Sequence, residues 1–299
     1  MKKIIECVPN ISEGRDCAIV LECVNAVAAV PGVKVLNFSS DFDHNRSVIT
    51  FTGDEIGVME AAVRLCKKAS ELIDLRHHRG AHPRVGAVDV IPFIPIKGIS
   101  VDECIELSKI AARRIFEEAG IPTYLYEKSA TASHRENLAD IRRGEFESLA
   151  QKTKDPLWQP DLGAGYHESA GVSVVGVRDF LIAYNIYLDT DDLKIAKNIA
   201  KIIRKSGGGF DGVKAIGLKL EAAREVQVSI NIVDYKKAPM YRIVETVRME
   251  AKRYGVRIKN TELIGLVPME ALAESAGYYL QIRDFDSEKM ILENYIFGD

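Results

Sequence analysis

The chain has 299 residues, 47% of them hydrophobic and 28% charged, a composition typical of a globular protein that buries a core without disulfides. Forty basic and 43 acidic side chains leave a formal net charge of −3, which removes the general electrostatic attraction on which nucleic-acid binders depend. The five cysteines form no CxxC pair, and no apolar run approaches the ~18 residues that a membrane-spanning helix requires. We therefore predict a cytoplasmic protein with reduced cysteines, without a signal peptide, membrane segment or nucleic-acid partner.

The first half of the chain mixes strand-like and helix-like patterns. In chain order we predict a strand at Ile4 to Val8, a helix at Cys17 to Val30, a hairpin of Val33 to Ser39 and Ser47 to Gly53, a helix at Asp54 to Ile73, a strand at Val85 to Ile96, a helix at Ser100 to Ala119 and a strand at Thr123 to Tyr126. Ser100 and Glu103 have the spacing of a capping box, and Gly120 is placed to end that helix.

The second half begins with irregular sequence. A short helix is expected near Leu138 to Ile141, and Trp158 to Gly171 has the composition of an extended loop. Beyond it we predict strands at Val172 to Val177 and Phe180 to Tyr187, a helix at Asp191 to Lys205, a strand pair at Lys214 to Leu220 and Gln227 to Asp234, and a helix at Pro239 to Tyr254. This order predicts an α+β protein of two lobes with a boundary near Asp179.

Two polar loops concentrate reactive side chains. The first, Asp41 to Arg46, joins two carboxylates, an imidazole, an amide and a guanidinium, and is either a solvated turn or a substrate loop. The second, Asp74 to Arg84, holds three histidines and three arginines. His78 and His82 stand four residues apart as in helical zinc motifs, but Gly80 and Pro83 argue against a helix there. A histidine in such a loop suits acid/base catalysis near neutral pH.

Glycines gather at two further places. Gly163, Gly165 and Gly171 lie in the long loop, and the GGGFDG stretch with Gly217 follows a predicted helix. Glycine lets a backbone approach a flat ligand closely, so both stretches are candidate binding sites. Neither has the order of strand, loop and helix that a nucleotide-binding fingerprint requires.

At these residues the sequence resembles the glutamate formiminotransferase family. The resemblance is carried by ECVPNISEGR (Glu6 to Arg15), DHNRSV (Asp43 to Val48), IDLRHHRGAHPRVGAVDVIPFIPIKG (Ile73 to Gly98), GIPTYLY (Gly120 to Tyr126) and IGLVP (Ile264 to Pro268). These stretches span nearly the whole chain, and their joint occurrence is specific.

The resemblance implies two α+β subdomains of ferredoxin-like character, residues 1–178 with the catalytic histidine and residues 179–299 with the folate and substrate cleft. Each is expected to be a mixed β-sheet with helices on one face, and the two sheets to face each other across a ligand cleft. The family's catalytic histidine falls on His82 of the HPR motif.

The folate contacts are likewise implied by the resemblance, whereas the substrate contacts are hypotheses from the chemistry of the two polar loops. Substrate contacts are expected from Asp43, His44, Asn45, Arg46 and Arg84, with the two arginines holding glutamate carboxylates. Folate contacts are expected from Gly163, Ala164, Gly165, Gly171, Gly208, Gly209, Lys214 and Gly217. Ser39 stands where some relatives have an acidic residue, and Asp41 or Asp43 is expected to take its place.

The implied reaction moves a formimino group from N-formimino-L-glutamate to the 5-position nitrogen of tetrahydrofolate, a co-substrate of one-carbon metabolism and histidine degradation. No metal is expected. A homodimer is expected, and a separate cyclodeaminase, because the sequence ends at Asp299 before any such domain. Three alternatives stay open: formyl transfer between 5-formyltetrahydrofolate and glutamate, a metal-dependent hydrolase built on His77, His78 and His82, and a nucleic-acid-binding module.

Overall fold

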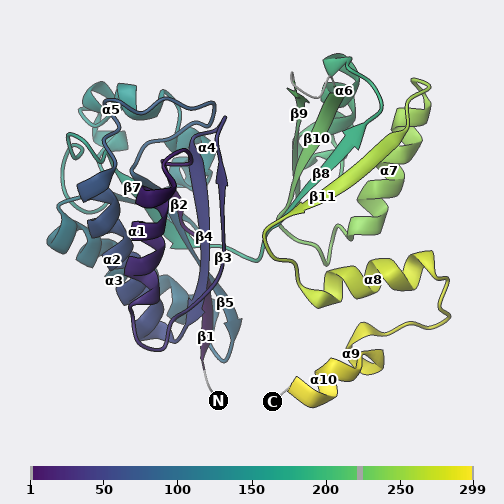
Figure 1. The fold of residues 1–299 in the computed structure, drawn as a ribbon, viewed down its shortest axis with the longest axis horizontal. Helices are drawn as coiled ribbons and strands as arrows, with labels where there is room; N and C mark the ends of the chain where they lie inside the picture. The colour runs from purple at the N-terminus through teal and green to yellow at the C-terminus, as the bar shows by residue number, and fades with distance from the viewer. Residues whose placement is uncertain (1–2, 221–224, 298–299) are drawn as a thin grey trace. The chain divides into compact units, whose positions relative to one another are not determined.

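The computed structural model describes residues 3–220 and 225–297, and its contacts divide the chain into two units, Met1–Arg178 and Asp179–Asp299 (Figure 1). The first unit contains β1 (Ile4–Cys7), β2 (Asn10–Ile11), α1 (Cys17–Ala28), β3 (Lys34–Asp41), β4 (Arg46–Gly53), α2 (Glu55–Leu72), β5 (Val88–Lys97), α3 (Val101–Ala119), β6 (Thr123–Glu127), α4 (Leu138–Ile141), α5 (Glu145–Lys152) and β7 (Ser173–Val177). Short 3₁₀ turns occupy Ser133–Arg135 and Pro156–Trp158.

The first unit is built on a seven-stranded mixed sheet. Its strands run in the order β1-β4-β2-β5-β7-β6, with β3 paired to β4 at one edge. β1 and β2 both lie between β4 and β5, so they are successive segments of one central strand, interrupted at Pro9. β7 pairs in parallel with β5 and β6, and the other pairings are antiparallel. The ends of β2, β3 and β4 bring the residues after Ile11 close to the 42–45 turn.

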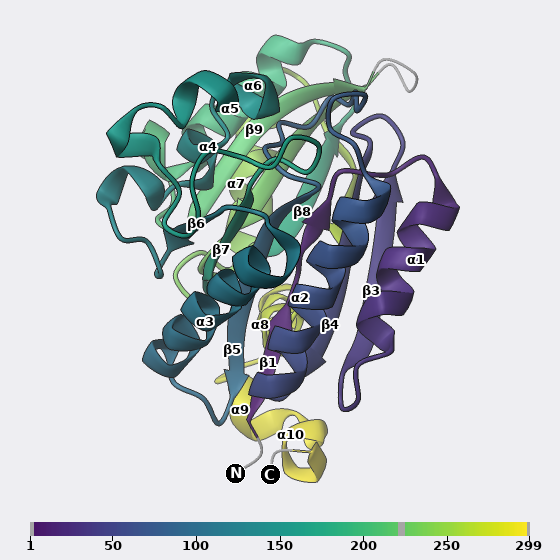
Figure 2. The ribbon, with the colours of Figure 1, turned by 90° about the vertical axis from the view of Figure 1, so that its left-hand side faces the viewer.

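Three helices cover one face of this sheet (Figure 2). α1, α2 and α3 pack on it through regularly spaced small and aliphatic residues, and the core beneath them includes Phe51, Phe93 and Leu65. α3 begins with the predicted capping box of Ser100 and Glu103 and ends at Gly120 in the left-handed conformation. These helices lie on one face as predicted, and in addition a separate cluster packs α4 and α5 over Tyr124 and Tyr126.

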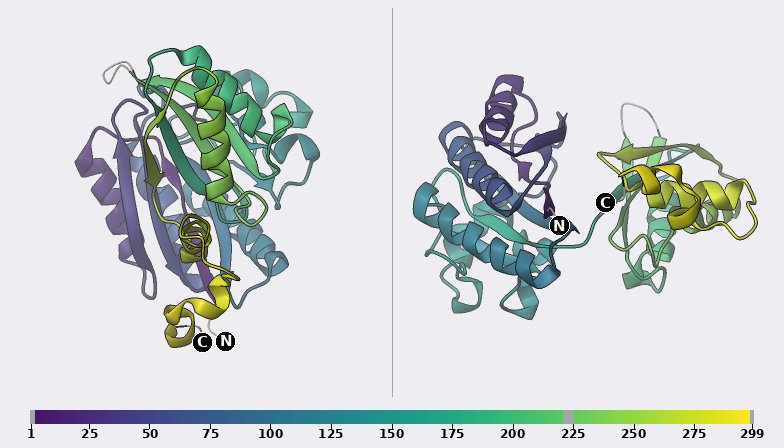
Figure 3. Two further views of the ribbon diagram at one scale, coloured as in Figure 1. Left: turned by 90° about the vertical axis from the view of Figure 1, so that its right-hand side faces the viewer. Right: turned by 90° about the horizontal axis from the view of Figure 1, so that it is seen from below.

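The second unit consists of β8 (Ile182–Leu188), α6 (Leu193–Ile203), a 3₁₀ turn (Lys205–Gly207), β9 (Val213–Leu220), β10 (Glu225–Ile232), α7 (Met240–Lys252), β11 (Ile258–Ile264), α8 (Met269–Tyr279), α9 (Ser287–Met290) and α10 (Leu292–Phe297). Its four strands form an antiparallel sheet in the order β11-β8-β10-β9. α6 and α7 cover one face of it (Figure 3). The opposite face carries polar side chains, where Tyr187 and Asn185 both donate to Glu262.

The α+β class predicted from the sequence is confirmed, with two differences in detail. The second sheet is purely antiparallel rather than mixed, because each neighbouring pair of strands runs in opposite directions. β11 and the helices α5, α8, α9 and α10 were not predicted. The apolar residues of β11 alternate weakly and its side chains are mostly exposed, so the period-two pattern that marks a half-buried strand is faint.

Within the described residues, no helix has the length and apolarity needed to cross a membrane. Cys7, Cys23, Cys66 and Cys104 are buried free thiols, and burial raises the pKa of each. Deep burial in apolar surroundings makes these thiols structural residues rather than reactive ones.

Candidate active site

Three loops of the first unit meet at Asn45. The backbone N–H of Gly14 donates to its side-chain oxygen at 3.0 Å, and its amide nitrogen donates to the carbonyl of Arg79 at 3.0 Å. Its backbone carbonyl bonds Nε2 of His78 at 2.9 Å. Asn45 is buried and adopts a φ of 49°, a left-handed conformation that asparagine tolerates better than most residues. Asn45 therefore holds the three loops together through its own hydrogen bonds, and its predicted substrate contact stays a prediction.

Two glycines allow this close approach. A Cβ atom on Gly80 would lie 2.2 Å from the carbonyl oxygen of His44, and one on Gly14 would lie 2.3 Å from the carbonyl oxygen of Asp41. Ala81 N–H also donates to the carbonyl of Asp43 at 3.1 Å. The glycines of the SEGR and RGAHPR stretches therefore let the loop backbones touch, since any side chain there would separate them.

Arg84 fixes the tautomer of His78. Its Nε donates to Nδ1 of His78 at 3.1 Å. Because a guanidinium can only donate, Nδ1 accepts, and the proton of the neutral ring is on Nε2, which donates to the carbonyl of Asn45. Burial is the largest cause that lowers the pKa of His78, which keeps the ring neutral. His78 is therefore a structural histidine.

The same arginine is saturated by internal partners. Nη1 donates to Glu145 and Glu147 at 2.8 Å each, and Nη2 donates to Glu147 at 2.7 Å. Its side chain is only 7% exposed. The structure argues against the predicted carboxylate clamp at Arg84, since its donors already hold two acidic residues of α5 and the 76–84 loop.

His82 lies in a small pocket beside these contacts. The pocket is lined by Ile11, Ser12, His44, Asn45, Arg46, His78, His82, Arg84 and Asp89. Burial, followed by the charges of Arg46 and Arg142, lowers the pKa of His82 to about 2. The backbone carbonyl of Pro83 opposes this shift but is outweighed. The free protein thus presents a neutral imidazole, the form that accepts a proton.

Two arginines next to His82 differ in their partners. Arg142 donates through Nε to Asp89 at 2.9 Å and pairs with it through Nη2 as well, and Asp89 also accepts from the backbone of Val85 at 2.7 Å. Arg46 has no ion pair with any residue that the structure describes, and its Nε is buried without a hydrogen-bond partner. Burial and the charge of Arg142 lower the pKa of Arg46 to about 10, against the opposing charges of Asp89 and Asp41, so it is still a cation at neutral pH.

The remaining residues of the first loop stand around His82. The rings of His44 and His82 are 6.2 Å apart at their centroids and meet edge to face. Nδ1 of His44 lies 2.9 Å from a carboxylate oxygen of Asp41, whose pKa is lowered by hydrogen bonds from His44 although burial opposes the shift. Asp43 contributes its backbone carbonyl to the loop contact, so Asp41 rather than Asp43 is the acid that holds His44.

The histidine triplet does not converge on a common point. His77 is 84% exposed at its side chain, and both ring nitrogens of His78 are engaged by Asn45 and Arg84. Among the residues that the structure describes, no three His, Cys, Asp or Glu side chains are arranged to hold a metal ion. Binding a metal at His78 would break two buried hydrogen bonds, which weakens the hydrolase alternative.

Sequence reasoning missed Asp89 and Arg142. A signal existed for Asp89, since a single acid in the apolar run GAVDVIPF is out of place unless it has a buried partner. No pattern marked Arg142, which comes from the irregular stretch before α5 and reaches Asp89 only through the tertiary fold. Ser12 was likewise not singled out, and its hydroxyl donates to the carbonyl of Gly86 at 2.7 Å.

Comparison with known families accounts for both units. The formiminotransferase domain, N-terminal subdomain, matches residues 4–178, and the formiminotransferase domain matches residues 183–294. The chain belongs to the formiminotransferase family. Similar relatives include a glutamate formimidoyltransferase of Streptococcus pyogenes, 51% identical with all of both chains covered, and one of Thermoplasma acidophilum, 46% identical over 97% of this chain and 96% of the relative. A rat formimidoyltransferase-cyclodeaminase is 38% identical over 98% of this chain and 54% of its own.

The glycines predicted to contact folate in the first unit have mixed surroundings. A Cβ on Gly171 would lie 2.1 Å from the carbonyl of Val85, so its glycine is needed where the 167–171 turn packs on the chain before β5. Gly163 similarly makes room for the ring of Phe116. Gly165 has open space around it, and Ala164 is exposed, so these two positions are accessible to a ligand.

In the second unit the predicted folate glycines mostly serve α6. A Cβ on Gly217 would lie 2.4 Å from the backbone nitrogen of Lys197, and one on Gly209 would lie 2.2 Å from the carbonyl of Ile202. Gly208 takes a φ of 89° in the turn after the helix. Helix packing and turn geometry thus explain these glycines without a ligand. Lys214 is exposed on β9.

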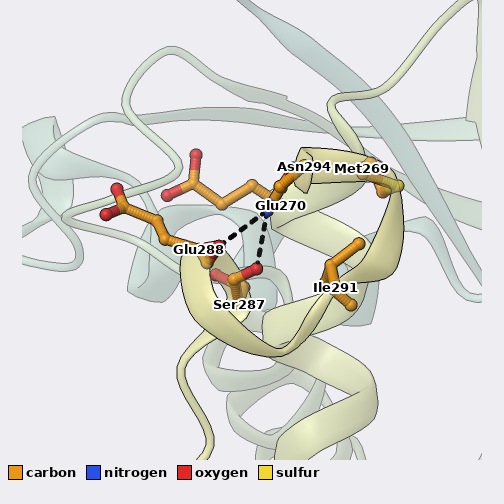
Figure 4. Close-up of a pocket in the computed structure, with 6 residues that line it drawn as sticks. All are labelled: Met269, Glu270, Ser287, Glu288, Ile291 and Asn294. Atoms are coloured by element: carbon orange, nitrogen blue, oxygen red, sulfur yellow. Dashed lines mark hydrogen bonds between the residues drawn. The ribbon is translucent and has the colours of Figure 1, made fainter. Parts of the chain in front are cut away.

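The second unit also contains a cavity of about 330 Å³ near its C-terminal helices (Figure 4). It is lined by Met269, Glu270, Ser287, Glu288, Ile291 and Asn294. The amide of Asn294 donates to the carbonyls of Ser287 and Glu288 at 2.9 and 3.2 Å, which ties α10 to α9. No histidine or arginine lines this cavity, whereas the pocket around His82 contains both.

Proposed function

We propose that this protein is a glutamate formimidoyltransferase that moves the formimino group of N-formimino-L-glutamate to the 5-position nitrogen of tetrahydrofolate. Membership of the formiminotransferase family and 51% identity to a glutamate formimidoyltransferase over the full chain support the reaction. The observation that supports the role of the site is a neutral imidazole, His82, beside a half-buried arginine, Arg46, that has no ion-pair partner among the described residues.

His82 is the proposed acid/base catalyst. As the folate nitrogen attacks the amidine carbon, a new carbon–nitrogen bond forms and the attacking nitrogen must lose its proton. The neutral ring of His82 accepts that proton and then delivers it to the glutamate nitrogen, whose bond to the same carbon breaks. One imidazole can perform both transfers because it titrates between its two forms at each step.

Arg46 is the proposed receptor for a carboxylate of formiminoglutamate. The Nε of Arg46 is buried without a hydrogen-bond partner, and a carboxylate would supply the missing acceptor and match the fork of guanidinium donors. Arg84 has no such vacancy, and we assign it the positioning of His78 instead. His44, held by Asp41, borders the same pocket and is a proposed contact for either substrate.

Tetrahydrofolate remains the proposed acceptor, with Ala164 and Gly165 as the most accessible of its predicted contacts. Lys214 is a further proposed contact from β9. We also propose that the protein forms a homodimer and is located in the cytoplasm, as expected from the sequence.

The test is a coupled assay with formiminoglutamate and tetrahydrofolate on the wild-type protein and on His82→Ala. Loss of the acid/base group is expected to lower turnover by about 10² to 10⁴-fold. His77→Ala is a matched control, because the neighbouring ring is 84% exposed and should leave turnover unchanged. Thermal melting of both variants separates loss of chemistry from loss of fold.

Unchanged turnover in His82→Ala would refute the mechanism. A wild-type protein that is inactive with formiminoglutamate but converts 5-formyltetrahydrofolate and glutamate would show that formyl transfer is the physiological reaction. Inactivity with both donors would refute the proposed function itself.

A further inference from the structure

The charges around His82 are not balanced. Arg142 is paired with Asp89, and Arg84 with Glu145 and Glu147. Arg46 forms no ion pair with a described residue and its Nε is buried without an acceptor, although the carboxylates of Asp41 and Asp89 attract it from farther away. The pocket therefore carries one cation without a direct carboxylate partner beside the imidazole.

Every element around His82 contributes a charged or titratable group. These are Arg46 of β4, Arg142 after α4, Asp89 of β5, His44 of the 42–45 turn, and His78 and Arg84 of its own loop. Asp89 is the acid that lines the pocket, and Arg142 already uses it; Asp41 of β3, the cross-strand neighbour of Arg46, is engaged by His44. Adding a proton to His82 in the free protein would thus place a further positive charge beside Arg46 and Arg142 in a poorly solvated pocket, which is unfavourable.

The proposed reaction nevertheless requires His82 to accept a proton. We propose that a carboxylate of the amino-acid substrate binds Arg46 and, by cancelling its charge, enables His82 to accept the proton of the attacking nitrogen. His82 would then act as a base only when the amino-acid substrate occupies the pocket. This inference rests on the proposed function and adds to it a coupling between substrate binding and proton transfer.

The coupling is electrostatic, and a bound carboxylate shifts His82 toward its protonated form. An opposite charge within about 4 to 6 Å favours the charged form of a titrating group by about 1 to 3 pH units. The carboxylate supplies a negative charge on the side of the ring where Arg46 lies, so the positive charge of Arg46 no longer opposes that of the imidazolium. The proton moves from the folate nitrogen to the ring and from the ring to the glutamate nitrogen, and no other reagent is needed.

The experiment is an NMR titration of the protein labelled with ¹⁵N in its histidine rings, with His82→Ala used to assign the His82 signals. Spectra are recorded from pH 8 to pH 3 without ligand, with glutarate, and with glutaramide, the uncharged diamide of the same shape. Each series is repeated with 5-formyltetrahydrofolate present, so that ordered binding is covered. We expect His82 to stay neutral down to pH 3 without ligand and with glutaramide, and to protonate within this range with glutarate, which raises the midpoint by about 1 to 3 pH units.

Variants of Arg46 provide an independent arm. Arg46→Gln removes the cation, so the His82 midpoint is expected to rise by about 1 to 3 pH units without ligand and to lose its response to glutarate. Arg46→Lys is the matched control because it keeps the charge, and its His82 ring should stay neutral in the free protein. If Arg46→Gln does not fold, the comparison of glutarate with glutaramide on the wild type still decides the question.

Two outcomes would overturn the inference: glutarate that binds without moving the His82 midpoint, or glutarate that fails to bind with and without the folate. Failure of the proposed function is distinguishable, because it appears as a wild-type protein with no transfer activity in the coupled assay, whatever the titration shows.

Discussion

Two adjacent histidines of the 76–84 loop, His77 and His78, lie in different environments. His77 is exposed, whereas His78 is buried, neutral and bonded through both ring nitrogens. The dipeptide HH does not indicate which of the two rings is buried, because the burial of His78 depends on its contacts with Arg84 and with Asn45, which comes from a distant loop. The chemistry of His82 depends in the same way on Arg46 and Arg142.

We expect His78→Ala to lower the free energy of unfolding by about 1 to 3 kcal/mol, because it leaves a buried carbonyl at Asn45 and a donor at Arg84 without partners. His77→Ala should stay within about 0.5 kcal/mol of the wild type. Urea denaturation followed by circular dichroism measures both. Equal losses in the two variants would contradict the assignment of the buried role to His78.

Arg84 provides a test between a positioning role and a substrate role. Lysine keeps the charge but cannot reproduce the fork that holds His78, Glu145 and Glu147. If Arg84 positions the loop, Arg84→Lys should lower kcat and the free energy of unfolding together, the latter by about 1 to 3 kcal/mol, with KM for formiminoglutamate nearly unchanged. A rise in KM with an unaltered stability would restore the carboxylate clamp predicted from the sequence.

At the scale of elements, glycines set the distances between helices, strands and loops. Gly217 of β9 lies against the backbone of α6, and Gly80 and Gly14 let the loops around Asn45 touch. These positions explain why glycine-rich stretches resemble ligand sites in the sequence. A glycine needed for a close backbone approach looks the same whether the approaching atom belongs to a ligand or to a helix.

Gly217→Ala is expected to destabilise the second unit by about 1 to 3 kcal/mol, because the new methyl group would overlap the backbone of Lys197 and force β9 away from α6. Gly208→Ala is a useful comparison. Its Cβ would meet open space, so only the left-handed φ of 89° opposes the change, at about 1 kcal/mol. Thermal and urea unfolding of the two variants should rank them in that order, and the reverse order would contradict the packing argument.

At the scale of the whole molecule, the two units have separate cores and different titrating groups. The sheet and helices of residues 179–299 enclose an apolar cluster of their own, as do those of residues 1–178. All six histidines belong to the first unit. Acid sensitivity near neutral pH should therefore be a property of one unit alone.

We expect each unit to unfold cooperatively when expressed alone, and only residues 1–178 to lose stability between pH 7 and pH 5. The folded state lowers the pKa of His78 and His82, so below about pH 6.5 the unfolded chain binds protons that the folded unit does not. Stability is thus complete above pH 6.5 and falls with acidification, by up to about 1.4 kcal/mol per pH unit for each ring.

Urea denaturation at several pH values measures this dependence, with residues 179–299 as the histidine-free control. His82→Gln in the first unit should reduce the slope by as much as one proton. A slope of equal size in the second unit, or one unaffected by His82→Gln, would contradict the assignment to buried neutral histidines.

The sequence by itself determined the α+β class, most of the helices and strands, the capping box of α3, the formiminotransferase family and the two loops that meet in the pocket. These features are local or carried by contiguous stretches: apolar periodicity, caps and motif words depend on residues near one another in the chain. The second sheet departs from the prediction in strand direction, which periodicity does not encode, and in its edge strand β11, whose apolar alternation is faint.

The tertiary structure alone decided which polar residues are partners. The donors of Arg84 are occupied by Glu145 and Glu147, which lie more than sixty positions away in the sequence. Arg46 has no such ion-pair partner among the described residues. Asp89 and Arg142 met for the same reason, 53 positions apart. A buried charge must be compensated by whatever group the fold brings within a few ångströms, and that distance is a property of the packed chain rather than of any segment of its sequence.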